Sequence, residues 1–179
     1  VTGKSYGRLL EERIFTPLGI HRTQLDTAGR LEAPYAHGYT DMCAPAGEKG
    51  SDTSSWTMLA FSAGALASTI DDLHTFGTAF GEGLGLSDQM LRARISDTSP
   101  GDDASGLGLV VERDPKFDSV VSIGHAGSEP GYGANLLYFP CSGAVFAAMV
   151  NADFAPAMPE ILRAVQPVVR ELAEAECVT

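Results

Sequence analysis

Hydrophobic residues recur at helical spacing in the N-terminal half of the chain. Their pattern predicts amphipathic helices over residues 6–14, 71–80 and 87–95. Pro17 is expected to stop the first helix. In Ser68-Thr-Ile-Asp71-Asp72, a hydroxyl three residues before a carboxylate is expected to cap the second. Residues 19–60 lack this period and are rich in Gly, Pro, Asp and Thr, which predicts a long irregular connection. Such a connection is more often functional than idle, and its packing residues are expected to be Leu25, Tyr35, Tyr39 and Trp56.

The pattern changes to short β-branched and aromatic runs in the last third of the chain. These runs predict antiparallel strands over residues 106–112, 120–124, 134–139 and 144–150, followed by an amphipathic helix over residues 158–172. The expected fold class is therefore α+β. The segment 98–105, rich in Ser, Asp, Gly and Pro, is the expected boundary between a mostly helical and irregular lobe, residues 1–104, and a lobe of strands with a packed helix, residues 105–179.

Composition narrows the classes of partner. The 179 residues carry a formal net charge of −11, with neither a basic cluster nor an apolar run of membrane-spanning length, so nucleic acid and membrane are not expected partners. Three cysteines without Cys-x-x-Cys spacing predict neither a disulfide framework nor a zinc site. The four histidines are scattered as well, and we expect no metal and no cofactor.

The sequence His125-Ala126-Gly127-Ser128 carries the most informative candidate chemistry. On a strand, His125 and Gly127 would face one side, and the absence of a Cβ at Gly127 would let a ligand approach the backbone. The backbone N–H of Ser128 would then be placed to stabilise an oxyanion in acyl transfer. A histidine before a glycine-rich turn is also commonly a plain surface residue, and both interpretations stay open on these four residues alone.

A second motif lies at the N-terminus. Gly3-Lys4-Ser5-Tyr6-Gly7 has the Gly-x-Ser-x-Gly spelling of a nucleophile elbow, but the elbow requires a preceding strand and this sequence supplies none. Ser5 stands where a helix cap belongs, so the spelling favours a cap over a nucleophile. Gly3-Lys4-Ser5 also resembles the end of a phosphate-binding loop, without the upstream glycine and strand that such a loop needs.

Taken in order, several segments resemble the serine β-lactamase-like family, which includes class C β-lactamases, D-alanyl-D-alanine carboxypeptidases and related esterases. The matching segments are Thr2–Tyr6, Glu12–Ile20 with its Pro-Leu-Gly turn, Ala36–Tyr39, Ser62–Leu73 with its Ser-Ala-Gly and Ser-Thr-x-x-Asp-Leu elements, His125–Gly127 and Asn151. Their order spans nearly the whole chain. The resemblance implies the C-terminal part of a β-lactamase/transpeptidase-like fold, with His125–Gly127 as its Lys/His-x-Gly motif.

The resemblance also implies which residues form the site. His125 and the Ser128 backbone would act on the substrate carbonyl, and Gly127 and Tyr39 would contact the substrate. That substrate would be a small molecule or a peptidoglycan peptide. Because a neutral imidazole holds a carboxylate less firmly than an ammonium does, His125 in place of lysine favours a carboxypeptidase- or esterase-like enzyme. The family is typically periplasmic or extracytoplasmic, although a cytoplasmic location stays open.

Two motifs of the family do not occur in this sequence. Its nucleophile lies in Ser-x-x-Lys, whereas the residues three before Lys4, Lys49 and Lys116 are Val1, Ala46 and Arg113, and no tyrosine begins a Tyr-x-Asn. We therefore expect the chain to correspond to the part that follows these motifs and to be inactive alone. Two alternatives remain: a non-catalytic binding module, or a half that assembles with a separate N-terminal fragment or with itself.

Overall fold

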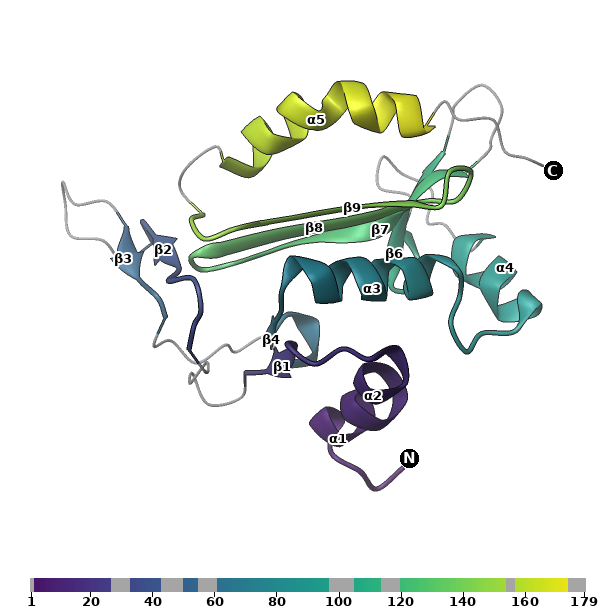
Figure 1. Cartoon of the computed structure of the whole chain (residues 1–179), viewed down its shortest axis with the longest axis horizontal. Helices are drawn as coiled ribbons and strands as arrows, with labels where there is room; N and C mark the ends of the chain where they lie inside the picture. The colour runs from purple at the N-terminus through teal and green to yellow at the C-terminus, as the bar shows by residue number, and fades with distance from the viewer. Residues whose placement is uncertain are drawn as a thin grey trace.

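A computed structural model describes residues 2–26, 33–42, 50–54, 61–96, 105–113, 120–153 and 157–173. Its centre is an antiparallel sheet in the order β5-β6-β7-β8-β9. Helices precede this sheet and a C-terminal helix follows it, so the α+β prediction is confirmed (Figure 1). The strands of the sheet are β5 (Ser105–Gly106), β6 (Leu109–Arg113), β7 (Val120–Glu129), β8 (Tyr132–Phe139) and β9 (Ala144–Val150).

Strand β7 is longer than its hydrophobic pattern predicts. The pattern ends at Gly124, but the strand continues to Glu129 and pairs with β8 as far as Tyr132. A two-residue turn of Pro130 and Gly131 closes the hairpin, and Gly131 adopts a φ of +87°, which few other residues tolerate. The extension arises from pairing with β8, which the exposed residues of β7 do not reveal in sequence.

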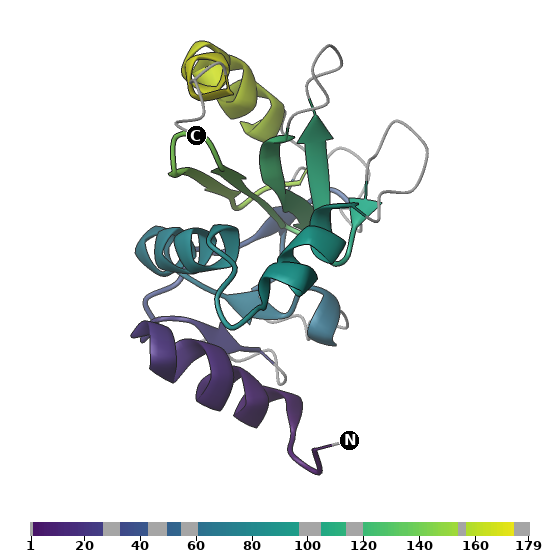
Figure 2. The same cartoon turned by 90° about the vertical axis from the view of Figure 1, so that its right-hand side faces the viewer.

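Helices cover both faces of the sheet. Helix α3 (Ile70–Gly81) lies on one face and helix α5 (Ala157–Ala173) on the other (Figures 1 and 2). Two glycines of α3 permit its close approach, since a Cβ at Gly77 would lie 2.8 Å from Val145 and one at Gly81 would lie 2.1 Å from the Tyr138 ring. The main core cluster forms beneath this helix from Leu109, Val111, Ile123 and Tyr138, with Phe80, Ile95, Val120 and Val145 packed against it.

The N-terminal helical segment runs past the predicted stop at Pro17. It comprises α1 (Tyr6–Leu10), a π-helical turn η1 (Glu11–Phe15) and α2 (Thr16–Leu18), and it ends at Gly19, whose φ is +68°. A bond from the Ile20 amide to the Phe15 carbonyl, 2.9 Å, completes the glycine-type C-cap. At the other end the Ser5 hydroxyl accepts from the Arg8 amide, so Ser5 is a helix cap as predicted.

The cap of α3 is a hydroxyl three residues before a carboxylate, as predicted. Of the two hydroxyls in the segment, Thr69 accepts the hydrogen bond from the Asp72 amide. The Ser68 hydroxyl instead lies 2.8 Å from the Thr23 hydroxyl, which also donates to Asp72 at 2.8 Å. These bonds join the start of α3 to the strand pair of β1 (Gln24–Leu25) and β4 (Leu66–Ala67). A 3₁₀ turn, η2 (Phe61–Ala63), comes before β4 in the chain.

The remaining elements differ in how well the sequence indicated them. Helix α4 (Asp88–Ser96) agrees with the predicted segment 87–95. The strand pair of β2 (Tyr39–Thr40) and β3 (Ser51–Asp52) lies in the connection predicted to be irregular, of which Trp56 is outside the described residues. Cys141 is disulfide-bonded, which the prediction of no disulfide framework missed. No helix in the described part of the chain has both the length and the hydrophobicity to cross a bilayer.

Candidate functional site

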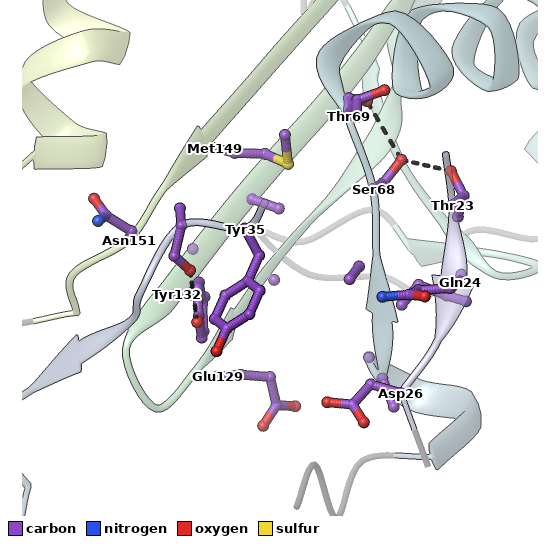
Figure 3. A pocket seen from close by; sticks show the side chains of 18 of the residues that line it. Thr23, Gln24, Asp26, Tyr35, Ser68, Thr69, Glu129, Tyr132, Met149 and Asn151 are labelled. Carbon is purple, nitrogen blue, oxygen red and sulfur yellow. Dashed lines mark hydrogen bonds between the residues drawn. The ribbon is translucent and has the colours of Figure 1, made fainter. Parts of the chain in front are cut away.

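A cleft of about 930 Å³ opens at the end of the sheet where the β7–β8 hairpin turns. One wall is formed by β7, β8 and β9, and the opposite wall by β1 and β4 (Figure 3). Residues 33–36 also border the cleft. Segments from both ends of the chain therefore meet at this cleft, and its volume is in the range of small-molecule sites.

The sheet wall presents one face of three strands. Alternation along β7 places Gly127 and Glu129 on the same side, and the antiparallel register sets Ala134 opposite Gly127 and Met149 opposite Ala134. All four line the cleft. A Cβ built at Gly127 would meet nothing within 4 Å, so the space above this residue, the open floor of the cleft, is free for a ligand.

The predicted site residues separate into two groups. Gly127 and Ser128 line the cleft, whereas His125 and Tyr39 do not. His125 lies on β7 two residues before Gly127, with an exposed side chain. Tyr39 lies on β2, where its backbone amide donates to the Asn151 carbonyl at 3.0 Å. Tyrosines 35 and 132 are the ones that line the cleft.

Tyr35 is positioned by a ring contact and by the anchoring of the backbone that follows it. Its ring stacks on His37 with centroids 5.1 Å apart, and the residue is 38% exposed. The neighbouring backbone is anchored to the sheet, since Tyr132 donates its hydroxyl to the Ala36 carbonyl at 2.9 Å and the Asn151 amide donates to the His37 carbonyl at 2.9 Å. The segment before β2 is thus a fixed side of the cleft.

An exposed hydrogen-bonded contact between His37 and Asp52 supports this segment. The His37 Nδ1 lies 2.8 Å from the Asp52 carboxylate. Hydrogen bonds from the Ser54 hydroxyl, then from His37 and the Ser54 amide, lower the pKa of Asp52 from 3.8 to about 2. Asp52 therefore remains an anion throughout the neutral range, and it acts on the cleft only through the position of His37 and Tyr35.

The hairpin turn is fixed by Asp153. Its carboxylate accepts from the buried Thr40 hydroxyl at 2.6 Å and from the Gly131 amide at 3.0 Å. Burial raises the pKa of Asp153, but the hydrogen bonds from Thr40 and Gly131 outweigh it and the net shift is downward. Thr53, also fully buried, donates to the Pro130 carbonyl at 3.0 Å. These bonds set the end of β7 relative to β2 and β3.

The chemistry of the cleft is that of a binding wall. Among the described residues, the hydroxyls that line it make no hydrogen bond to a histidine or a lysine, and the Thr23 hydroxyl donates to the Asp72 carboxylate at 2.8 Å. The described part of the chain also contains no cluster of three or more metal-ligating side chains. The polar groups that line the cleft include backbone groups of β7, the Glu129 carboxylate and the Tyr35 phenol.

Sequence reasoning missed several lining residues. Asp26 and Glu129 received no role, and Tyr35 was expected only to pack the connection between the first two helices. No local signal marks these residues, because they belong to elements about 100 positions apart and meet only in the folded chain. Ser68, which also lines the cleft, belongs to the Ser-Thr element before α3.

Comparison with known proteins agrees with the architecture. The family model described as Beta-lactamase matches residues 1–169. The chain is 26% identical to a D-stereospecific amidohydrolase from Streptomyces sp., with a TM-score of 0.76 over 91% of this chain and 48% of that one. It is 25% identical to a D-amino acid amidase from Ochrobactrum anthropi SV3 solved with L-phenylalanine amide, with a TM-score of 0.73 over 96% of this chain and 51% of that one.

A penicillin binding protein from Bacillus halodurans shares the fold. It is 18% identical, with a TM-score of 0.78 over 93% of this chain and 50% of that one. The chain thus spans about half the length of these solved structures.

Proposed function

Because this chain belongs to the β-lactamase family, we propose that it supplies the substrate-binding wall of a serine hydrolase. The reaction is acyl transfer to a serine from another segment, followed by hydrolysis of the acyl-enzyme. Gly127 admits the substrate to the backbone of β7, and the Ser128 N–H stabilises the developing oxyanion. His125 hydrogen-bonds the substrate further along the strand. The observation that carries the proposal is the open floor at Gly127 within the cleft.

The register of β7 supports the role of Ser128. In an antiparallel hairpin closed by a two-residue turn, the pair beside the turn is of the hydrogen-bonded type and the types then alternate. Glu129 and Tyr132 flank the turn, so Ser128, paired with Gly133, directs its N–H away from β8. Among the described residues, β6 pairs with β7 only as far as Gly124, and the Ser128 N–H therefore points to an open edge.

The substrate class is a small amide or ester. Two solved neighbours that are at least 25% identical are amide-hydrolysing proteins by name, and one holds an amino-acid amide. Histidine in place of lysine at position 125 points in the same direction, since a neutral imidazole holds a carboxylate less firmly than an ammonium does. We therefore propose an amidase-, carboxypeptidase- or esterase-type reaction in preference to efficient β-lactam hydrolysis.

A complementary segment must carry the nucleophile. Strand β9 is an edge of the sheet in the described part of the chain, and its seven residues include no charge and no proline. Such an edge readily pairs with another strand. We propose that the complementary half of the domain pairs with β9, because the solved structures of this fold are about twice as long as the chain. Light scattering of the chain alone is expected to show self-association, and a stable monodisperse monomer would contradict this pairing.

Activity measurements test the proposed division of roles. The chain alone is expected not to hydrolyse nitrocefin or a p-nitrophenyl ester. Turnover by the purified chain that is lost in His125→Ala, but retained in the exposed control His74→Ala, would place the whole reaction in this chain and overturn the proposal.

The second test uses the chain joined to an upstream segment that carries Ser-x-x-Lys and Tyr-x-Asn. This protein is expected to prefer amides and esters to cephalosporins, and the opposite preference would contradict the substrate class. An upstream coding sequence without these motifs would instead favour a non-catalytic binding module. The described hydroxyls of the cleft, none of which is hydrogen-bonded to a histidine or a lysine, also fit such a module.

A further inference from the structure

Three large apolar side chains are exposed inside the cleft. Leu66, Ile70 and Met149 line it and are 43%, 47% and 39% exposed. They come from three separate elements, since Leu66 lies on β4, Ile70 is the first residue of α3 and Met149 lies on β9. Figure 3 shows the Met149 side chain on the opposite side of the opening from Thr23. Apolar side chains exposed within a concave site are the usual lining of a small-molecule pocket. We call these three residues the apolar end of the cleft.

The packing of α3 on β9 brings Ile70 to the level of Met149. A Cβ at Gly77 would lie 2.8 Å from Val145, which fixes the helix against the strand at that point. Ile70 lies two helical turns before Gly77 on the same face of α3, about 10 Å away. Met149 lies four residues after Val145 on the same face of β9, about 13 Å away. Figure 1 shows that the start of α3 and the end of β9 lie toward the same end of the sheet. The stripe of α3 that faces the sheet therefore continues into the cleft.

A trough with a floor of small residues joins the apolar end to the proposed carbonyl site. Ala134 pairs with Gly127 and Met149 pairs with Ala134, so the three residues lie in line across the sheet. Neighbouring strands are about 4.8 Å apart, which places Met149 about 10 Å from Gly127. Between them the floor carries only the methyl group of Ala134. The cleft thus has the proposed backbone donor at one side of this trough and an apolar surface at the other.

We propose that the cleft takes amides or esters with an extended apolar acyl chain, and that the apolar end is the subsite for the end of that chain. This subsite rests on the proposed function, because the carbonyl at the Ser128 N–H fixes where the chain begins. An extended chain of about eight carbons, with C–C bonds of about 1.5 Å, covers the distance from Gly127 to Met149. Shorter acyl groups leave the apolar end uncovered and bind less tightly.

Titration of the chain with neutral primary amides tests the subsite without requiring turnover. The ligands are propanamide, hexanamide and octanamide, and binding is followed in NMR spectra by the Gly127 and Ser128 amides and by the Met149 methyl group. A half-buried methylene contributes about a factor of two in affinity, so octanamide should bind about thirtyfold more tightly than propanamide. All three ligands should shift the Gly127 and Ser128 amides, whereas propanamide should leave the Met149 methyl group unchanged.

Met149→Ala is the decisive variant because it removes most of the side chain at the far side of the trough. It should weaken octanamide binding about fivefold and leave propanamide binding unchanged. Met90→Ala is the matched control, since Met90 lies on α4, does not line the cleft and is 55% exposed. It should change neither affinity. Ile70→Ala, which places a good helix former at the start of α3, is the second variant and should act as Met149→Ala does.

Failure of the subsite and failure of the proposed function give different results. Equal binding of all three amides, or an unchanged preference for octanamide in both Met149→Ala and Ile70→Ala, overturns the apolar subsite even when Gly127 and Ser128 respond. A response of Met149 with none at Gly127 and Ser128 would support the apolar subsite and contradict the proposed carbonyl-binding wall. Absence of binding by any of the amides overturns both.

The chain joined to its upstream segment gives the last test, because that segment could cover the same surface. Octanamide should still bind this longer protein more tightly than propanamide, as a substrate subsite requires. Loss of the preference in the longer protein would mean that the upstream segment, rather than an acyl chain, packs on Ile70 and Met149, and it would overturn the subsite.

Discussion

Two glycines on strand β7 are expected to give opposite results when each is replaced by alanine. A Cβ at Gly127 would meet nothing within 4 Å and would project into the cleft. A Cβ at Gly124, three residues earlier on the same strand, would lie 2.0 Å from the Leu136 carbonyl oxygen and 3.0 Å from the Leu137 Cα. These neighbours are backbone atoms, which cannot move aside as the end of a flexible side chain does. Gly124→Ala must therefore distort the β7–β8 pairing.

The magnitudes follow from these contacts. Gly127→Ala incurs no steric cost and restricts the unfolded chain, which stabilises by roughly 0.4–1 kcal/mol. Gly124→Ala is an overpacking change that costs about 1–3 kcal/mol. At roughly 2–4 °C per kcal/mol for a domain of this size, the midpoints of thermal unfolding should differ by at least about 3 °C. Gly127→Ala should nevertheless weaken binding of phenylalanine amide, because the added methyl group occupies the floor of the cleft.

Circular dichroism melts of the two variants and of the unchanged chain measure the stability effect. Titration with phenylalanine amide, followed by amide chemical shifts in NMR spectra, measures binding. A Gly124→Ala protein as stable as the unchanged chain would mean that the register of β7 against β8 is wrong. A Gly127→Ala protein that binds phenylalanine amide with unchanged affinity would show that Gly127 is not in contact with the ligand. Either result would remove the basis for assigning the oxyanion role to Ser128.

Three further predictions concern the scaffold around the cleft. Thr69→Ala removes the cap of α3 and should lower the free energy of unfolding by about 1 kcal/mol in urea titrations, with Thr69→Ser close to the unchanged chain. Phe139→Ala empties a fully buried position in β8 and should cost roughly 3–5 kcal/mol in the same assay. Because the pKa of Asp52 is lowered from 3.8 to about 2, its bonds with Ser54 and His37 should persist above about pH 4 and be lost as the pH falls through 2, as followed by carboxyl-carbon NMR titration. An Asp52 titration centred near pH 4 would contradict that last expectation.

Hydrophobic period was sufficient to predict the major elements. The segments 71–80, 134–139 and 144–150 agree closely with α3, β8 and β9, because each buries a regular stripe or face against a neighbour. The length of strand β7 was underestimated because its last residues bury no such face. Residues 125–128 are exposed, and their extended conformation comes from pairing with β8 across the hairpin.

The residues of the candidate site also differ in whether one strand or contacts between distant segments determine their position. Gly127 and Ser128 are proposed to act through the backbone, so the alternation and register of a single strand locate them once that strand is predicted. The choice of Tyr39 over Tyr35 could not be made from sequence, since it depends on hydrogen bonds from Tyr132 and Asn151 that fix the intervening segment against the sheet. A tyrosine four residues away in a connection without period carries no signal of which ring faces the cleft.

Strand β7 and its turn together set the proposed carbonyl site. Ser128 directs its backbone N–H to the open edge of the strand, because alternate pair types have fixed directions in an antiparallel ladder. The turn at Pro130 and Gly131 fixes this direction, and Asp153 holds that turn through the Gly131 amide. Asp153→Asn weakens the hold on the turn and should reduce binding of phenylalanine amide and N-acetyl-phenylalanine amide together. An Asp153→Asn effect confined to the charged ligand would contradict this coupling.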